Sequence, residues 1–292
     1  MKQKKPFLCF FILTVLLVTG WTGRKGLAEP IYDRIKTVSY SFNLRNTTNQ
    51  VLTDAVFRTY APVSLTSAQR CCLRLESSHP YQLETDDLGN QVLKFEFNQL
   101  PPYITTMVRV TAELAMASEP NKNPNLILQR YLDEEPLIES DHPEIKTVAA
   151  KLQTGESMET MENIYAWVNE HVRDSGYLRE ARGALYALQN KQGDCTENAY
   201  LFAALARANG IESRPVGGYF IENNGLLKAA AYHEWAEFND QGTWRLADPQ
   251  MRVFNGNYPN YVAMHILDNR DDALFSFARF QHSGNGLTVT MN

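Results

Sequence analysis

Residues 193–211 read GDCTENAYLFAALARANGI, and the rest of the chain can be organised around this stretch. Asp194 is a residue type that caps helix N-termini, and Gly210 is of the type that ends helices. Between them, apolar side chains repeat at helical spacing and leave little of the circumference polar. This pattern predicts a mostly buried helix that starts at or just after Cys195.

The thiol of Cys195 would lie at the N-terminal end of this helix, where unpaired amide groups and the helix dipole favour the thiolate. Cys195 is therefore a candidate nucleophile. A lone cysteine in a helix is more often a buried apolar residue, so further residues are needed to support this role.

The N-terminus has the pattern of a signal peptide. Three lysines precede an apolar run from Phe7 to Val18, and Gly26-Leu27-Ala28 then places small residues where signal peptidase prefers them. The run is short for a membrane span, which needs ~20 residues. We expect residues 1–28 to be a signal peptide and the protein to be exported, periplasmic or secreted, with no stable membrane span after cleavage. An uncleaved anchor is the alternative.

Composition and charge exclude some function classes. The chain has 292 residues, of which 44% are hydrophobic and 21% charged, as is typical of a globular protein with room for two domains. The charged residues that cleavage would remove are all basic, so the formal net charge of −5 would become more negative. Nucleic acid is therefore not an expected partner.

Three cysteines would remain after cleavage: Cys71, Cys72 and Cys195. The Cα atoms of neighbours across a trans peptide lie ~3.8 Å apart, which is less than the ~4.4 Å that disulfide geometry favours. We therefore expect no bridge between Cys71 and Cys72. An odd number of cysteines in an oxidising compartment leaves at least one unpaired, and we expect Cys195 to be free.

The chain divides by the period of its hydrophobic pattern. Residues 35–117 alternate between apolar and polar types, which predicts about six half-buried strands and a β-sandwich domain at residues 29–117. Prolines interrupt residues 118–141, which we expect to be a linker. Helical patterns and then strands follow, so residues 142–292 are expected to form a second domain, which would be catalytic.

A predicted hairpin carries a candidate base. Residues 231–238 and 243–248 have strand patterns on either side of a turn. In the register that we predict across this turn, His233 pairs directly with Asp248. Asp248 could then hold one ring nitrogen of His233 while the other meets a thiol. A bulge would change this register, so the pairing depends on the turn.

Four motifs in this order resemble the transglutaminase-like superfamily of papain-type thiol enzymes: GDCTE at 193–197, RANGIESRPVGG at 207–218, YHEWAEF at 232–238 and WRLADP at 244–249. The resemblance spans residues 141–249. It implies that Cys195 is the nucleophile, His233 the general base and acid, and Asp248 its orienting partner. It also implies an α+β fold in which the cysteine helix packs on an antiparallel sheet. A preceding β-sandwich is similar to bacterial exported members.

The resemblance implies a thiol enzyme that acts on a glutamine carboxamide or a peptide amide bond through a thioester. An amine or water would resolve the thioester, by transamidation or hydrolysis. The Cys195 amide is expected in the oxyanion hole, with Gln189 and Trp167 as candidates for the second donor. A protein or peptide substrate is expected, and neither a cofactor nor a metal.

Two other functions compete with this one. A catalytically silent binding or adaptor module could keep the fold, although the presence of all three triad residues argues against it. A Cys/His metal site would need three or four ligands, and one cysteine with one functional histidine falls short of that number.

Overall fold

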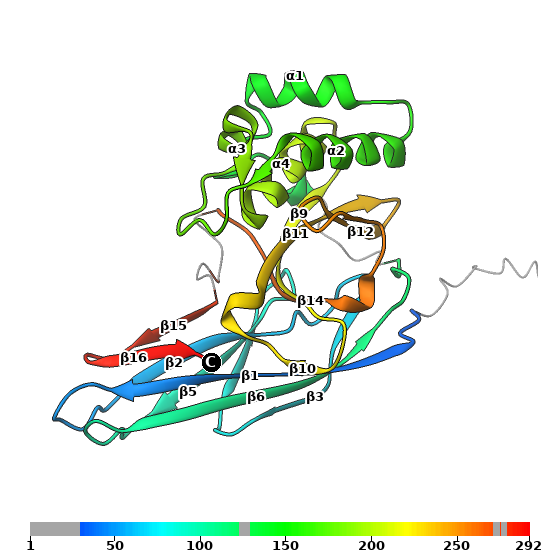
Figure 1. Cartoon of the computed structure of the whole chain (residues 1–292). Helices are drawn as coiled ribbons and strands as arrows, with labels where there is room; N and C mark the ends of the chain where they lie inside the picture. The colour runs from blue at the N-terminus through cyan, green and yellow to red at the C-terminus, as the bar shows by residue number, and fades with distance from the viewer. Residues whose placement is uncertain (1–29, 123–128, 271–274, 276–278) are drawn as a thin grey trace, which may run out of the picture.

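The first part of the protein is built from two β-sheets. The structure is a computed structural model, and it describes residues 30–122, 129–270, 275 and 279–292. The first sheet holds β1 (Arg34–Asn46), β3 (Gln69–Ser77) and β6 (Thr105–Met116), and the second holds β2 (Ala55–Ala61), β4 (Gln82–Thr85) and β5 (Gln91–Phe97). Alternate apolar side chains from both sheets are buried in one shared core. The period-two pattern thus correctly predicted a β-rich region ahead of the helices (Figure 1).

Late segments of the chain return to these sheets. β16 (Leu287–Met291) pairs with β1 and β15 (Phe280–Ser283) pairs with β2, both antiparallel. β10 (Gly225–Leu226) adds a parallel edge to β1. The division into domains after residues 117 and 141 stays a prediction, because strands from both sides of it share the same sheets.

The second part packs helices on one face of an antiparallel sheet. Its helices are α1 (Pro143–Leu152), α2 (Ser157–His171), α3 (Ala184–Asn190) and α4 (Cys195–Ala208), with short strands β7 (Arg173–Asp174) and β8 (Gln192–Gly193) between them. The sheet has the order β13-β12-β11-β9-β14 and is made of β9 (Ser213–Phe220), β11 (Tyr232–Asp240), β12 (Thr243–Asp248), β13 (Val253–Phe254) and β14 (Tyr261–Ile266). Three 3₁₀ turns, η1 (Gln129–Tyr131), η2 (Ala229–Ala231) and η3 (Tyr258–Asn260), complete the elements. The predicted α+β class is therefore correct.

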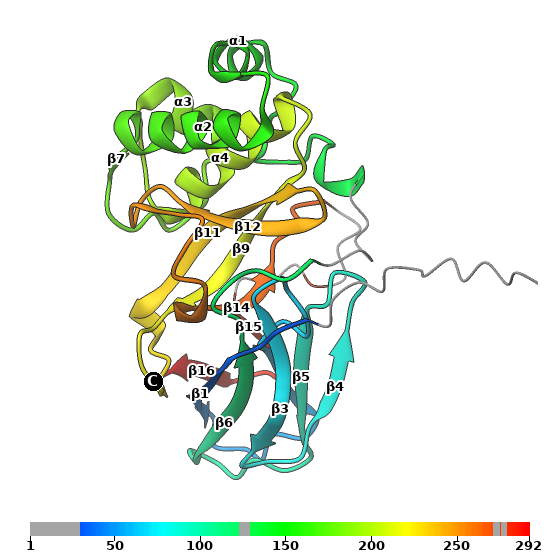
Figure 2. The ribbon, with the colours of Figure 1, turned by 90° about the vertical axis from the view of Figure 1, so that its right-hand side faces the viewer.

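The two faces of this sheet contact different cores. Ala236, Phe238 and Ala247 pack under α4 in the helical core. Trp235 and Trp244 point the other way, into a cluster with aromatic residues from outside the sheet. Figure 2 shows the helices on one side of β11 and β12 and the strands of the first part on the other. Helix α4 is buried along most of its length because it lies between the sheet and the other helices.

Helix α4 begins at Cys195, as the sequence predicted. The side chain of Asp194 accepts a hydrogen bond from the amide of Thr196 at 2.9 Å, and Glu197 Oε2 accepts one from the amide of Asp194 at 3.1 Å. These reciprocal bonds form a capping box, which stabilises the helix start. Gly210 follows the helix with φ +73°, as a C-terminal glycine should.

The register of the β11–β12 hairpin differs from the prediction by two residues. Asp240 pairs with Thr243, so the turn contains only Gln241 and Gly242, both with positive φ as in a type I′ turn. Ala236 consequently pairs with Ala247. A shift of two residues keeps every side chain on its predicted face, because side chains alternate along a strand.

Cys71 and Cys72 form a disulfide, with a cis peptide bond between them. The prediction that they do not pair was wrong because it took this peptide bond to be trans. Cys195 is the free cysteine of the described residues, in agreement with the prediction.

The predicted signal peptide and residues 123–128 of the predicted linker lie outside the described residues. Within the described ranges, no helix combines the length and the apolar character that crossing a membrane would require.

Candidate active site

His233 and Asp248 are in direct contact. His233 Nε2 lies 2.6 Å from Asp248 Oδ2, although the two residues are diagonal neighbours across the hairpin instead of a direct pair. The Tyr261 hydroxyl donates to the same carboxylate oxygen at 2.9 Å, and the amide of Met251 donates to Oδ1 at 3.0 Å. Asp248 is only 1% exposed. Its carboxylate is thus held on both oxygens, and Nδ1 is the ring nitrogen of His233 that remains for another partner.

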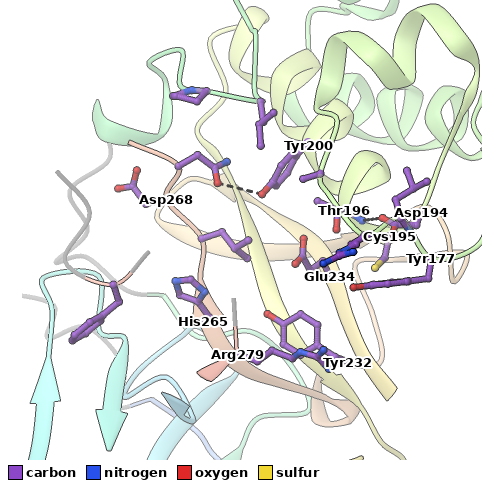
Figure 3. Close-up of a pocket in the computed structure, with 18 of the residues that line it drawn as sticks. Tyr177, Asp194, Cys195, Thr196, Tyr200, Tyr232, Glu234, His265, Asp268 and Arg279 are labelled. Atoms are coloured by element: carbon purple, nitrogen blue, oxygen red, sulfur yellow. Dashed lines mark hydrogen bonds between the residues drawn. The ribbon is translucent and has the colours of Figure 1, made fainter. Parts of the chain in front are cut away.

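Cys195 lies against the strand that carries His233. Its sulfur lies near the backbone amide of Glu234, the residue that follows His233, and near the side chain of Thr196. The residue is half-buried and lines a cavity of about 1000 Å³. Figure 3 shows Cys195 with Thr196, Glu234 and Tyr177 around it. Helix α4 and strand β11 together place the thiol beside the histidine-bearing backbone.

The pKa of Cys195 is shifted upward. Burial, followed by the negative charges of Glu234 and Asp194, raises it to about 12, while the Glu234 amide and the Thr196 side chain act in the opposite direction. This is the opposite of the direction that the helix N-terminus alone predicts. At neutral pH the thiol is therefore protonated, and it needs a base or a change in the local charge to become nucleophilic.

Glu234 is a residue of the cavity that sequence reasoning missed. It lines the cavity beside Cys195, and burial raises the pKa of its carboxyl group to about 7. A hydrogen bond from the Thr196 side chain acts against that shift. Glu234 has the same alternation along β11 as Ala236 and Phe238, which pack under α4, and this was the available signal. His233 and Asp248 are not among the residues that line the cavity.

Two glycines allow the strands to approach at the site. Gly218 pairs with His233 and Gly217 with Glu234 in the β9–β11 ladder. A Cβ on Gly218 would lie 2.0 Å from the carbonyl oxygen of Val262, and one on Gly217 would lie 2.0 Å from the Tyr232 hydroxyl. Glycine is therefore required at Gly218, where the close atom belongs to the backbone, whereas at Gly217 the Tyr232 side chain would have to move.

Gln189 and Trp167, the candidates for a second oxyanion donor, are engaged elsewhere. Gln189 donates to Glu144 Oε1 at 2.9 Å, and Trp167 stacks on His171 with ring centroids 4.3 Å apart. Neither residue lines the cavity that holds Cys195. The geometry gives neither of them support as a donor.

His265 is the histidine that lines the cavity, but its surroundings are structural. It stacks on Tyr60 at 4.2 Å between centroids, and burial lowers its pKa to about 3. It is therefore a neutral packing residue. Across the described parts of the chain, histidine, cysteine and acidic side chains do not gather in any group of three that could hold a metal ion.

Comparison with known proteins identifies the domain that contains these residues. Residues 146–249 match the family model of the transglutaminase-like superfamily, so the chain carries a transglutaminase-like domain that includes Cys195, His233 and Asp248. No curated protein matches the chain.

Solved structures agree with the fold. The chain is similar to a proposed cysteine protease from Cytophaga hutchinsonii, with a TM-score of 0.57 and 17% identity over 89% of this chain and 92% of that one. This similarity shows the fold alone. A weaker similarity, with a TM-score of 0.38 and 17% identity over 76% of this chain and 92% of that one, is to the periplasmic domain of TgpA from Pseudomonas aeruginosa.

Proposed function

We propose that this protein is an exported thiol enzyme that acts on glutamine carboxamides or peptide amide bonds, with Cys195 as nucleophile, His233 as general base and acid, and Asp248 as its orienting partner. The observation that carries the proposal is the 2.6 Å contact between His233 and Asp248 on a strand whose next residue, Glu234, lines the same cavity as Cys195. Export rests on the signal-peptide pattern of residues 1–28.

Asp248 would act by fixing the tautomer of His233. A carboxylate accepts hydrogen bonds and donates none, so it selects the ring form with the proton on Nε2 and the lone pair on Nδ1. The donors Tyr261 and Met251 keep the carboxylate in place. Nδ1 is then ready to accept the proton of the thiol.

The reaction would proceed in two halves. As the Cys195 sulfur bonds to the substrate carbonyl carbon, its proton moves to His233 Nδ1 and the carbonyl electron pair moves onto oxygen. The amide of Cys195, in the first turn of α4, has no acceptor within the helix and would donate to this oxyanion. Collapse of the tetrahedral intermediate then breaks the C–N bond, and His233 gives the proton to the leaving amine or ammonia.

The second half resolves the thioester. Water or an amine attacks its carbonyl carbon while His233 Nδ1 accepts the attacking proton, and that proton returns to sulfur as the thiol leaves. Water gives hydrolysis, and an amine gives transamidation. The cavity of about 1000 Å³ beside Cys195 is large enough for a side chain or a peptide segment of a protein substrate.

An activated ester tests this proposal without knowledge of the natural substrate. We expect residues 29–292 to release a burst of nitrophenol from p-nitrophenyl acetate that is stoichiometric with protein. Mass spectrometry should place the acetyl thioester on Cys195. Cys195→Ala should abolish the burst, and His233→Ala should slow it about 100-fold, the usual contribution of a general base. His171→Ala, which alters a histidine of α2 that stacks on Trp167, is the matched control and should react normally.

A burst of unchanged size in Cys195→Ala, or of unchanged rate in His233→Ala, would contradict the proposal. One observation favours the second candidate, a catalytically silent binding module, namely the pKa of Cys195 of about 12. A wild-type protein that forms no thioester at any pH would support that module.

A further inference from the structure

The cavity beside the thiol contains a carboxylate without a counterion. Glu234 Oε2 is buried and has no hydrogen-bond partner among the described residues. An unpaired buried acceptor is costly, and an unpaired buried charge is more so. The other acidic residue beside the thiol, Asp194, is satisfied by contrast, because its two oxygens accept hydrogen bonds from the amides of Thr196 and Leu178 at 2.9 and 2.8 Å.

Three arginines line the cavity. Arg179 is exposed and is not among the main charges that act on Glu234, and the other two are bound to other partners. Arg270 Nη1 lies 3.1 Å from Asp268 Oδ1, and Arg279 Nη1 donates to the carbonyl of Ala229 at 2.7 Å. The charged groups that act on Glu234 are Asp194 and Glu197, which disfavour its ionisation, and His233, which favours it. The site is thus acidic overall and open to the cavity, where a ligand could supply the missing positive charge.

The same carboxylate acts on the nucleophile. Glu234 is the charged neighbour with the largest effect on the pKa of Cys195, and the two residues line the same cavity. Figure 3 shows the Glu234 carboxyl group directed into the cavity next to the cysteine. A charge that is added at Glu234 therefore changes the electrostatic energy of the Cys195 thiolate, because the two groups are close and partly buried.

We propose that Glu234 binds a cationic N–H donor of the substrate, an ammonium or guanidinium group, and that the bound cation promotes ionisation of the Cys195 thiol. The cation pairs with the Glu234 carboxylate and offsets the negative charge that opposes the thiolate. The thiol proton passes to His233 Nδ1, as in the proposed mechanism, so the second half of this inference rests on the proposed function. Binding at Glu234 is independent of it.

Linkage makes the effect reciprocal. If the cation raises the thiolate fraction tenfold, the thiolate form binds the cation tenfold more tightly. Glu234 would thus be a positioning residue that makes the reactivity of the thiol depend on the charge of the ligand. With a neutral amide in the cavity the Cys195 thiol would stay protonated, whereas a cationic substrate would raise the fraction of the reactive thiolate.

Two small molecules of the same shape test the coupling. Methylguanidinium supplies a cation with N–H donors, and N-methylurea is its neutral counterpart. We expect methylguanidinium to accelerate alkylation of Cys195 by iodoacetamide at pH 8.5 about tenfold, and N-methylurea to have no effect. Glu234→Gln should alkylate faster than wild type without a probe and should not respond to methylguanidinium. Glu180→Gln, which removes an exposed carboxylate outside the cavity lining, should behave as wild type.

A binding measurement separates this inference from the proposed function. Calorimetric titration of Cys195→Ala with methylguanidinium needs no thiol, and Glu234→Gln in that background should weaken binding at least tenfold. Methylammonium, titrated in parallel, distinguishes an ammonium site from a guanidinium site by which of the two binds more tightly. Equal affinities with and without Glu234 would overturn the site, and binding without acceleration of alkylation would overturn the coupling.

Discussion

Asp248→Asn is the substitution that tests the proposed catalytic geometry most directly. It keeps the size of the side chain and removes one charge and one acceptor. The amide can keep its oxygen toward the Met251 amide, at 3.0 Å in the wild type, and then its NH₂ group faces His233 and Tyr261. His233 must in that case accept at Nε2 and carry its proton on Nδ1, the nitrogen that the thiol requires.

The opposite orientation of the amide is also unfavourable. With its oxygen toward His233, the asparagine places NH₂ against the Met251 N–H, and a buried donor loses its acceptor. Either way, a charge-assisted hydrogen bond worth about 1.5–3 kcal/mol is lost. This converts to an acylation rate roughly 10- to 150-fold lower.

The assay is the burst rate with p-nitrophenyl acetate, together with circular dichroism to confirm the fold. Tyr261→Phe is the matched control, because it removes one donor to Asp248 and leaves the carboxylate, so its rate should fall less. An Asp248→Asn protein that is folded and acylates within twofold of the wild-type rate would refute the role given to Asp248.

Three further outcomes follow from the geometry. Gly218→Ala should lower the free energy of unfolding by about 1–3 kcal/mol in urea titrations because its Cβ would lie 2.0 Å from the backbone of β14, whereas Gly256→Ala, with no neighbour nearer than 3.7 Å, should not. Glu237→Ala should lower the free energy of unfolding by about 3–5 kcal/mol, because it removes the partner of the buried Arg214, which is 2% exposed and lies 2.6 Å from Glu237. The double variant with Arg214→Met should recover much of this loss, and no recovery would argue against the ion-pair explanation. Since its raised pKa keeps the Cys195 thiol protonated at neutral pH, the alkylation rate without ligand should rise with pH throughout the range 7 to 9, and a plateau below pH 8 would contradict this.

The local features of the site were predictable from sequence because local chemistry decides them. The capping residue Asp194 and the apolar spacing after it place the start of α4, and the period-two pattern assigns the early strands. The contact of His233 with Asp248 agrees with the predicted pairing of these side chains because a register shift of two preserves the face on which each residue lies.

Other features depend on contacts between distant segments. The exact hairpin register follows from a two-residue turn, which the flanking sequence did not distinguish from a longer one. The pKa of Cys195 depends on burial by the surrounding fold and on Glu234, which comes from strand β11. The sequence-based argument considered the helix terminus alone and therefore gave the wrong direction. The return of β15 and β16 to the early sheets is likewise a nonlocal pairing with no local signal.

The pairing of β16 with β1 has a consequence for the order of folding. Residues 34–46 are synthesised well before residues 287–291, yet they lie side by side in one sheet. A ribosome adds residues from the N-terminus, so this edge of β1 stays uncovered until β16 has been made. Closing so long a loop costs entropy before any contact repays it, which slows folding. A nascent segment that lacks β16 therefore exposes an edge that the folded sheet protects.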